Sequence, residues 1–549
     1  MEKFLRGDIM NIIKDMKIIS SLEKIYDCDK MPTEALKSLS LLRNEKTSFQ
    51  LAVEAEEEFK GTPEITTSIK GLRIYTVEHI KSDLPMNKKG TDNYFRFSKS
   101  GYYPDLLLPV EGEVCFKKGI TVLWLEIDGA LNEAGKKKIE IKLSDKTVSV
   151  DAEIIDADLD FKDFVYTCWF HTDCLMSYYK FDAFSDEYWR VTENFLKTAS
   201  DYGMNCVLTP IFTPPLDTAI GKERPTVQLV DVYLNKGEYT FNFDKLTQWI
   251  EMAHRCNITY FELSHFYTQW GAKHAPKIMA TVDGKYKQIF GWKTRANSRK
   301  YKNFLAALSV ELKKYFEARN LKDKVLIHVS DEPAKSGLRA YSKASGHIHS
   351  LYEGYKIVDA LSDFSFYEKK IVSNPIPAND HIDKFLGKVE NLWVYYCGAQ
   401  NRDYVANRFF CNESVRTRVI GYQMFKYDIK GFLQWGYNFY FKRLSKGLID
   451  PYTVTDAGGY FASGDSFIVY PAKDGTPYHS LRLKVFNDAL QDMAALNTLS
   501  KLAGKEACLE IIEENGKHNL TFKAYPHDDK WLLSTREAVN AAIKAKISE

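Results

Sequence analysis

The stretch "RKYKNFLAALSVELKKYFEARN", residues 299–320, is followed closely by "VLIHVS", residues 325–330. In the first stretch, apolar residues recur every three or four positions, which predicts an amphipathic helix over 299–319. The second is a short run of branched apolar residues, typical of a parallel strand buried on both faces. A helix that leads directly into such a strand is one unit of an alternating α/β fold.

The same unit recurs on both sides of this stretch. Short apolar runs alternate with amphipathic runs from about residue 160 to about residue 440. About eight strands are expected, near 165–172, 206–212, 258–266, 325–330, 355–362, 369–377, 391–397 and 431–440. Strand–helix alternation of this number and length predicts a (β/α)8 barrel.

The segments that flank the barrel have a different texture. Before about residue 155, runs such as "TSFQLAVEA" and "ITVLWLEIDG" alternate apolar with polar residues, which predicts a β-sandwich. After the barrel, "SLRLKVFNDALQDMAALNTLSKLAG" predicts a long helix. The expected domains are a β-sandwich over 1–155, a catalytic barrel over 156–475, and a C-terminal helical segment over 476–549 that packs on the barrel.

Composition excludes several classes of function. The net charge of +2 gives no long-range field for nucleic acid or an anionic membrane. No apolar run is long enough to cross a bilayer, so no membrane insertion is expected. The nine cysteines form no CxxC pair, so neither a disulfide framework nor a zinc site is indicated. The N-terminus lacks a signal-peptide pattern and is typical of a cytoplasmic protein, although a secreted protein without its signal peptide would look the same.

Candidate site residues follow from the barrel prediction, because active sites of such barrels lie at the carboxyl ends of the strands. The polar and aromatic residues near those ends are His171, Asn205, Glu262, His265, Asp331, Glu332, Trp393, Tyr395, Tyr396, Trp435, Tyr437 and Asn438, with Asp465 in the loop-rich stretch that follows. Glycoside hydrolysis uses such carboxylates and aromatics, since flat rings pack on sugars while one acid protonates the leaving oxygen. Glu262 is equally well read as an acid that is salt-bridged inside the barrel.

Asp331 and Glu332 are adjacent where the strand 325–330 ends. Pro333 favours extended backbone at Glu332, so the two side chains should project to opposite sides with Cβ atoms about 5–6 Å apart. Such a pair does not easily straddle a sugar, but it can address two neighbouring atoms of one substrate. That geometry suits substrate-assisted hydrolysis, in which one carboxylate orients a 2-acetamido group and the other protonates the leaving oxygen. A solvated strand end or a helix cap is the structural alternative.

Four motifs, taken in order, resemble glycoside hydrolase family 123, the β-N-acetylgalactosaminidases. They are "HVSDEP" (328–333), "GFLQWGYNFY" (431–440), "DPYTVTDAGGYFASGDSFIVYP" (450–471) and "SLRLKVFNDALQDMAAL" (480–496). The stretch "LLRNEKTSFQLAVEA" (41–55) is similar to the β-sandwich domain of that family. The resemblance covers about residues 40 to 500.

This resemblance implies a retaining hydrolase that removes terminal β-linked N-acetylgalactosamine from glycosphingolipid-type oligosaccharides, without metal or cofactor. Asp331 would orient the acetamido group and stabilise the oxazolinium ion, and Glu332 would act first as general acid and then as base. The sugar-binding wall would comprise Trp393, Tyr395, Tyr396, Trp435 and Tyr437, with Trp435 stacking under the ring and Asn205, Asn438 and Asp465 as hydrogen-bonding residues.

Two other functions stay open from the residues alone. One is a two-carboxylate retaining glycosidase of another sugar, which would pair Glu332 with Glu262 about 5 Å apart. The other is a glycan-binding protein without catalytic activity, because a barrel scaffold does not by itself imply an enzyme.

Overall fold

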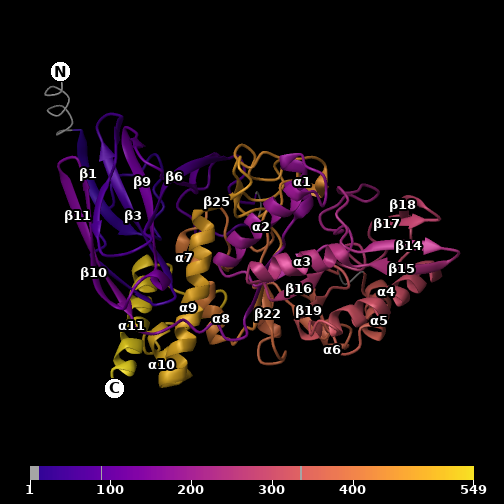
Figure 1. The fold of residues 1–549 in the computed structure, drawn as a ribbon. Coiled ribbons are helices and arrows are strands. Elements are labelled where there is room, and N and C mark those ends of the chain that lie inside the picture. The colour runs from indigo at the N-terminus through magenta and orange to yellow at the C-terminus, as the bar shows by residue number, and fades with distance from the viewer. Residues whose placement is uncertain (1–11, 88–89, 334–336) are drawn as a thin grey trace. The chain divides into compact units, whose positions relative to one another are not determined.

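The computed structural model describes residues 12–87, 90–333 and 337–549 (Figure 1). The chain forms two compact units. The sandwich unit comprises Met1–Asp163, Asn401–Tyr427 and Tyr478–Glu549, and the barrel unit comprises Phe164–Gln400 and Asp428–Pro477. The domain limits expected from the sequence stay a prediction, and the C-terminal helical segment expected on the barrel groups with the sandwich sheets in this division.

Two sheets form the sandwich unit. In the larger sheet the strands run in the order β1 (Ile13–Ser20), β3 (Lys46–Ala55), β9 (Gly119–Asp128), β6 (Arg73–Ser82), β7 (Gly101–Pro109) and β25 (Pro477–Ser480). In the smaller sheet the order is β2 (Ser38–Leu42), β11 (Lys146–Ile155), β10 (Gly135–Leu143) and β5 (Glu64–Thr67). Two short strands, β4 (Phe59–Gly61) and β8 (Val114–Phe116), pair with each other. A 3-10 turn, η2 (Gly129–Leu131), also belongs to this unit.

The sandwich core lies between these sheets. Ile139 and Ile141 of β10 are buried while Lys138, Glu140 and Lys142 are exposed, which is the period of two expected for a half-buried strand. They share one apolar cluster with Leu51 and Leu123 of the larger sheet. The predicted β-sandwich is therefore confirmed.

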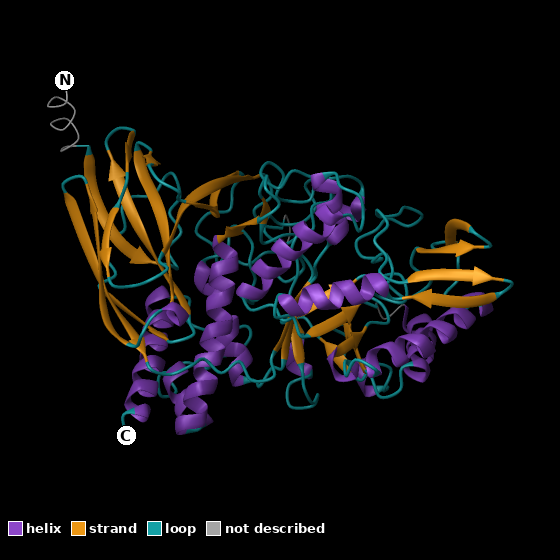
Figure 2. Ribbon diagram, viewed as in Figure 1, coloured by secondary structure: helices purple, strands orange, loops and turns teal. Residues whose placement is uncertain are grey.

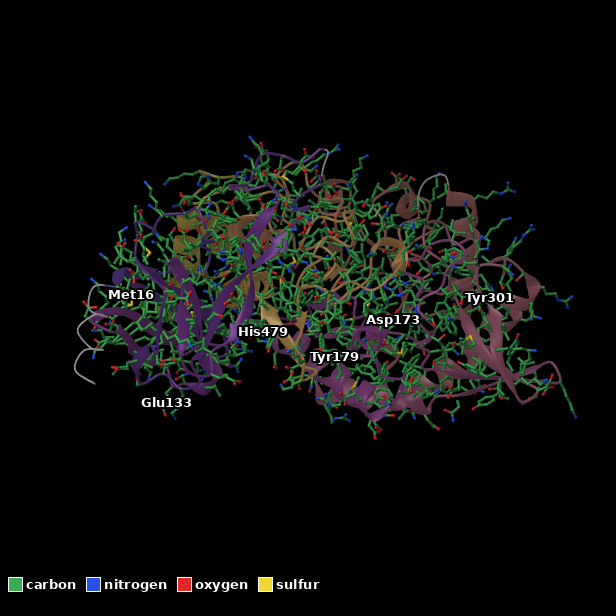
Figure 3. The ribbon with its side chains drawn as sticks, turned by 90° about the horizontal axis from the view of Figure 1, so that it is seen from above. Met16, Glu133, Asp173, Tyr179, Tyr301 and His479 are labelled. Carbon is green, nitrogen blue, oxygen red and sulfur yellow. The ribbon has the colours of Figure 1, made fainter. Side chains whose placement is uncertain are left out.

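The long helix α9 (Leu481–Ala503) covers the other face of the larger sheet. Leu481 packs in one cluster with Tyr75 and Trp124. Two buried ion pairs hold the helix, since Arg482 donates to Asp105 at 2.7 Å and Lys484 donates to Glu126 at 2.8 Å. The remaining helices of this unit are α7 (Ser414–Arg418), α8 (Ile420–Lys426), α10 (Lys505–Ile512) and α11 (Asp529–Ile547). His479, labelled in Figure 3, lies in β25 opposite Leu107.

Eight parallel strands form the barrel sheet, in the spatial order β21-β20-β19-β16-β13-β12-β23-β22. Figure 2 distinguishes the strands, in orange, from the helices, in purple. They are β12 (Val165–Cys168), β13 (Cys206–Thr209), β16 (Tyr260–Leu263), β19 (Val325–Ile327), β20 (Lys356–Ala360), β21 (Asn374–Ile376), β22 (Trp393–Tyr395) and β23 (Gly431–Gln434). A parallel bridge between Ala378 and Tyr395 joins the two outer strands and nearly closes the sheet on itself. The predicted (β/α)8 barrel is confirmed.

Helix α4 (Arg299–Glu317) confirms the helix predicted over 299–319. The other helices and turns of this unit are α1 (Thr172–Tyr179), α2 (Asp186–Asp201), α3 (Asp244–Arg255), α5 (Leu338–Leu351), α6 (Ser365–Glu368), η3 (Lys322–Lys324), η5 (Ile382–Lys384) and η6 (Arg443–Ser445), and a short strand is β24 (Tyr470–Pro471). A separate four-stranded sheet contains β15 (Glu238–Asn242), β14 (Asp231–Asn235), β17 (Ile278–Val282) and β18 (Lys285–Phe290). Within the described residues, no helix is long and apolar enough to cross a membrane.

Candidate active site

Asp331 and Glu332 stand at the carboxyl end of β19. Residues 325–330 are buried, and the side chains of the two acids that follow are half-buried and partly accessible to solvent. Backbone hydrogen bonds continue beyond the strand, because Tyr267 N donates to Val329 O at 3.0 Å and Trp270 N donates to Asp331 O at 2.9 Å. The loop that follows β16 therefore holds the segment that carries both carboxylates.

The backbone at Glu332 differs from the sequence prediction. Its φ is +39°, in the left-handed region, whereas Pro333 was expected to favour extended geometry. The prediction of extended backbone at Glu332 is therefore wrong. A residue with a Cβ is strained in this region, and such strain persists only where the surroundings enforce it. The hydrogen bond that fixes Asp331 O and the contact that Glu332 makes with Tyr395 supply that enforcement.

The two acids are electrostatically coupled. Burial of the Asp331 carboxyl, followed by the negative charge of Glu332, raises the pKa of Asp331 well above its ordinary value. Neighbouring carboxylates resist being ionised together, so Asp331 keeps its proton to a higher pH than an isolated aspartic acid does.

A cleft of about 860 Å³ opens beside Glu332. Tyr395, at the end of β22, lines the cleft and its hydroxyl donates to Glu332 Oε1 at 2.8 Å. The other polar residues of the cleft wall are Ser362, Asp363, Ser365, Glu368, His381, Lys384 and Lys388. The volume is in the range of a site for a sugar.

Trp435 and Asp465 approach the same region from the end of β23 and the loop beyond it. Trp435 is half-buried, and its Nε1 donates to Asp465 Oδ1 at 3.0 Å. Burial and the charges of Glu332 and Asp465 raise the pKa of the Cys397 thiol well above its ordinary value, which places both carboxylates near that thiol. A Cβ at Gly398 would lie 2.6 Å from Asp465 Oδ2, so a larger residue there would have to displace the Asp465 carboxylate.

Glu262 lies inside the barrel and not in the cleft. Its side chain is fully buried, and it accepts hydrogen bonds from Thr167 Oγ1 at 2.6 Å and Trp169 Nε1 at 2.8 Å. Its Oε1 also lies 2.5 Å from His328 Nε2. Both oxygens are therefore engaged, and Glu262 is the salt-bridged interior acid that the sequence left open.

His328 joins Glu262 to Asp359, a residue of β20. Burial lowers the pKa of His328, but Glu262 and Asp359 outweigh it and raise the pKa to about 10. Asp359 Oδ1 also accepts from Val329 N at 3.0 Å and Ser330 N at 3.3 Å, and Tyr341 donates to its Oδ2. This charged network therefore fixes the backbone directly before Asp331.

Asp359 is the functional residue that the strand-end rule did not find. It lies at the fourth position of β20, within an otherwise apolar run. A single acid inside a buried strand was the available signal, since such an acid needs a partner of opposite charge. His328, three residues before Asp331, is that partner.

His265 packs against His328, with ring centroids 4.5 Å apart. Burial and then the positive charge of His328 lower the pKa of His265 well below its ordinary value. Its two ring nitrogens are buried and have no hydrogen-bond partner within the described residues. A role of His265 in substrate binding stays a prediction.

A chain of hydrogen bonds runs from Asn438 through His171 to the backbone of Trp435. His171 Nε2 lies 2.8 Å from Trp435 O, and Arg224 donates to His171 Nδ1 at 3.1 Å. Burial and the charge of Arg224 lower the pKa of His171 well below its ordinary value, so the ring is neutral. Asn438 Oδ1 accepts from His171 N at 2.8 Å. Asp173 on α1, labelled in Figure 3, forms the ion pair that fixes Arg224.

Besides Glu262, four predicted site residues lie away from the cleft. Asn205 precedes β13, at the amino ends of the strands, where its side chain bridges Tyr166 N and Phe164 O. Trp393 begins β22 and covers Gly431 within the barrel core. Tyr396 is buried against Phe432, and the Tyr437 hydroxyl donates to Phe195 O at 2.9 Å. Asn205 lies at the opposite end of its strand from the cleft, and Trp393 and Tyr396 lie two and one positions from the cleft residue Tyr395.

Replacing Asp331 with Asn should change how stability depends on pH. The raised pKa of Asp331 means that its contribution to stability is fully present below the ordinary pKa and is lost as pH rises through the raised value. Asp331→Asn cannot ionise, so it should unfold at a higher temperature than the parent protein at about pH 8. Thermal unfolding followed across pH should show this difference vanish by about pH 4, and a constant difference would contradict the coupling.

The comparisons with known proteins agree with this architecture. A family model described as "Glycoside hydrolase 123, catalytic domain" matches residues 169–499. The structure of a family 123 glycoside hydrolase from Clostridium perfringens, described for glycolipid glycan hydrolysis, aligns with a TM-score of 0.70 at 16% identity, covering 97% of this chain and 98% of that chain. A family 5 mannosidase from Rhizomucor miehei aligns with a TM-score of 0.32 at 11% identity, over 60% of this chain and 94% of that chain. The sequence matches no curated protein.

The structural likeness to the Clostridium perfringens enzyme shows a shared fold. The family model goes further, because it spans more than half of the chain and includes the strand ends that form the cleft. This chain belongs to glycoside hydrolase family 123, and it is a glycosidase.

Proposed function

We propose that this glycosidase removes terminal β-linked N-acetylgalactosamine from glycans, with retention of configuration, by a substrate-assisted mechanism. The observation that carries the proposal is the adjacency of Asp331 and Glu332 at the end of β19, where burial and the charge of Glu332 raise the pKa of Asp331. Two neighbouring carboxylates suit two groups on adjacent ring carbons of one sugar, the acetamido N–H on C2 and the leaving oxygen on C1.

In the first step, the acetamido carbonyl oxygen of the substrate attacks C1 and the bond from C1 to the leaving oxygen breaks. Glu332 gives its proton to that oxygen, and Asp331 accepts a hydrogen bond from the acetamido N–H. The product of this step is a cyclic oxazolinium ion, whose positive charge the Asp331 carboxylate stabilises.

In the second step, Glu332 removes a proton from water, and the resulting oxygen attacks C1. The bond from C1 to the acetamido oxygen breaks, so the ring opens and the sugar leaves in its original β configuration. Two inversions at C1 give net retention. A hydrogen bond from the acetamido N–H to Asp331 favours the ionised form of that carboxyl, which is the form that this scheme requires.

The sugar-binding wall is proposed to include Trp435, Tyr395 and Asp465. Trp435 offers an aromatic face that is half-buried, and Asp465 fixes its ring through Nε1. Tyr395 holds Glu332 within the cleft. An aromatic platform with few well-placed polar groups is the usual composition of a sugar site.

Glycolipid glycans are the proposed source of the sugar. The Clostridium perfringens relative is described for glycolipid glycan hydrolysis, and it aligns with nearly the whole of this chain. The two-carboxylate alternative has no support from the described residues, since both oxygens of Glu262 are bonded inside the barrel. A role in glycan binding without catalysis is disfavoured by the family.

A panel of nitrophenyl glycosides tests the proposal. The β-N-acetylgalactosaminide should be hydrolysed, and the β-galactoside that lacks the acetamide should be slower by about 10³-fold, since it has no internal nucleophile. The β-N-acetylglucosaminide measures preference at the 4-hydroxyl. A thiazoline that mimics the oxazolinium ion should inhibit competitively. Comparable hydrolysis of the galactoside, or insensitivity to the thiazoline, would rule out the substrate-assisted route.

A further inference from the structure

A second cavity of the barrel unit, called here the basic cavity, is lined by an unusual set of charges. Its volume is about 480 Å³. Five cationic side chains line it, Lys273, Arg295, Lys302, Arg339 and Lys343, together with His274. Among the residues that the structure describes, no acidic residue belongs to the lining. Within the described residues, none of the five cations forms a side-chain hydrogen bond or an ion pair.

Other cations of this unit are paired where an acid is near. Lys277 lies 3.2 Å from Glu223, and Arg255 lies 2.9 Å from Glu193. The basic cavity is therefore a local concentration of positive charge in a chain whose net charge is only +2. Like charges gathered around one concave surface repel each other, and a bound anion relieves that repulsion.

The backbone around the basic cavity adds to the attraction. The cavity includes Gly337 and Arg339, at the N-terminus of the 14-residue helix α5, where no side chain of the described residues caps the helix. The first N–H groups of a helix are free to donate, and the helix dipole favours negative charge there. His274 also belongs to this lining. Its Nδ1 is buried and has no hydrogen-bond partner among the described residues.

The basic cavity shares a loop with the catalytic segment. Lys273 and His274 lie three and four residues after Trp270, whose N–H donates to Asp331 O at 2.9 Å. Arg339 and Lys343 lie on α5, the helix that follows β19 and its two acids along the chain. Loops and helix starts that follow barrel strands lie on the substrate-binding face.

We propose that the basic cavity binds an anionic group of the glycan substrate, either a sulfate ester or the carboxylate of an acidic sugar. Arginine pairs with both oxyanions through two parallel N–H···O bonds, and two arginines and three lysines line the cavity. The volume exceeds what a small inorganic ion fills and falls within the range of a site for a sugar residue. This inference rests on the proposed function and adds a substrate class, acidic glycans that end in β-linked N-acetylgalactosamine.

The test compares matched oligosaccharides that end in β-linked N-acetylgalactosamine, one neutral, one sulfated and one with a sialic acid on an inner sugar. The measured quantity is kcat/KM for each anionic substrate divided by kcat/KM for the neutral one. The double variant Arg295→Gln/Arg339→Gln should lower this ratio about tenfold, because each guanidinium gives a charge-assisted hydrogen bond. The substrate whose ratio falls in the variant, sulfated or sialylated, shows whether the cavity binds the sulfate ester or the carboxylate.

Lys285→Gln/Lys287→Gln is the matched control, because it removes the same charge from two exposed positions of β18 outside the cavity. It should leave the ratio unchanged. An unchanged ratio in the arginine variant, or an equal fall in the control, overturns the proposal. Calorimetry with inorganic phosphate gives a further outcome. If the parent protein binds phosphate, the arginine variant does not, and the ratio is the same in both, the cavity binds a free anion. That result would also overturn the proposal.

Failure of the proposed function has a different signature. If none of the three oligosaccharides is hydrolysed, the β-N-acetylgalactosaminidase assignment fails. Calorimetric titration of the same oligosaccharides then tests the basic cavity directly. Tighter binding of an anionic oligosaccharide by the parent protein, reduced about tenfold in Arg295→Gln/Arg339→Gln, would support the anion site, and equal binding of all three would refute it.

Discussion

Glu332→Gln is expected to lower kcat for a β-N-acetylgalactosaminide with a poor leaving group by about 10²–10⁴-fold, the usual range for loss of a general acid. Asp331→Asn should cost about 10²–10³-fold, because it removes the negative charge that stabilises the oxazolinium ion. KM should change far less in both variants, since each lost interaction strengthens mainly in the transition state. Steady-state kinetics on a phenyl and on a dinitrophenyl glycoside measure these effects.

The two leaving groups separate the two roles. A dinitrophenolate leaves without a proton, so Glu332→Gln should recover most of its first-step rate on that substrate, whereas Asp331→Asn should not. Asp323→Asn is a suitable control, because this exposed acid lies before β19, at the opposite end of the same strand. Recovery of both variants, or of neither, would contradict the proposed division between Asp331 and Glu332.

Glu262→Ala is expected to lower the free energy of unfolding by about 3–5 kcal/mol, the cost of breaking a buried ion pair by removing one partner. The substitution leaves the His328 imidazolium in the barrel interior with Asp359 as its remaining counter-charge, and it also removes acceptors from Thr167 and Trp169. Denaturant unfolding measures the loss. Glu193→Ala, at an exposed pair with Arg255, should cost less than about 1 kcal/mol.

The pH dependence distinguishes this charge effect from simple loss of packing. The pKa of His328 is raised to about 10, so its contribution to stability is fully present below about pH 6.5 and is lost as pH rises through about 10. Glu262→Gln keeps the size of the side chain but not its charge. The variant should therefore lose less stability than the parent protein as the pH rises toward about 10. An equal loss of stability in both proteins would show that Glu262 does not stabilise the charged form of His328.

The sequence was sufficient for the barrel because each strand leaves a local signal. Runs of buried branched residues and amphipathic helices such as 299–319 carry their period within a few turns. The strand-end rule then located Asp331, Glu332, Tyr395 and Trp435, which the structure places in or beside one region. The four-stranded sheet of β14, β15, β17 and β18 was not predicted, because its strands are short and rich in polar residues.

Errors among the site residues have a common physical origin. Neighbours in a strand point to opposite faces, and the two ends of a strand lie on opposite sides of the barrel. A shift of one residue from Tyr395 therefore misplaces Tyr396, whereas Asn205 precedes β13 and so lies at the amino end of its strand. The left-handed backbone of Glu332 was unpredictable for another reason, since contacts with distant parts of the chain override the local preference set by Pro333.

The sandwich unit has a consequence for biosynthesis, because its parts come from opposite ends of the chain. The buried ion pair of Arg482 with Asp105 joins residues 377 positions apart. A ribosome that adds about 5–20 residues per second reaches the second partner roughly 20–75 s after the first. Throughout that interval, the sheet face that α9 later covers, with Tyr75 and Trp124, has no covering layer. We therefore expect the nascent chain to depend on chaperones until translation nears completion, and C-terminal truncations to aggregate.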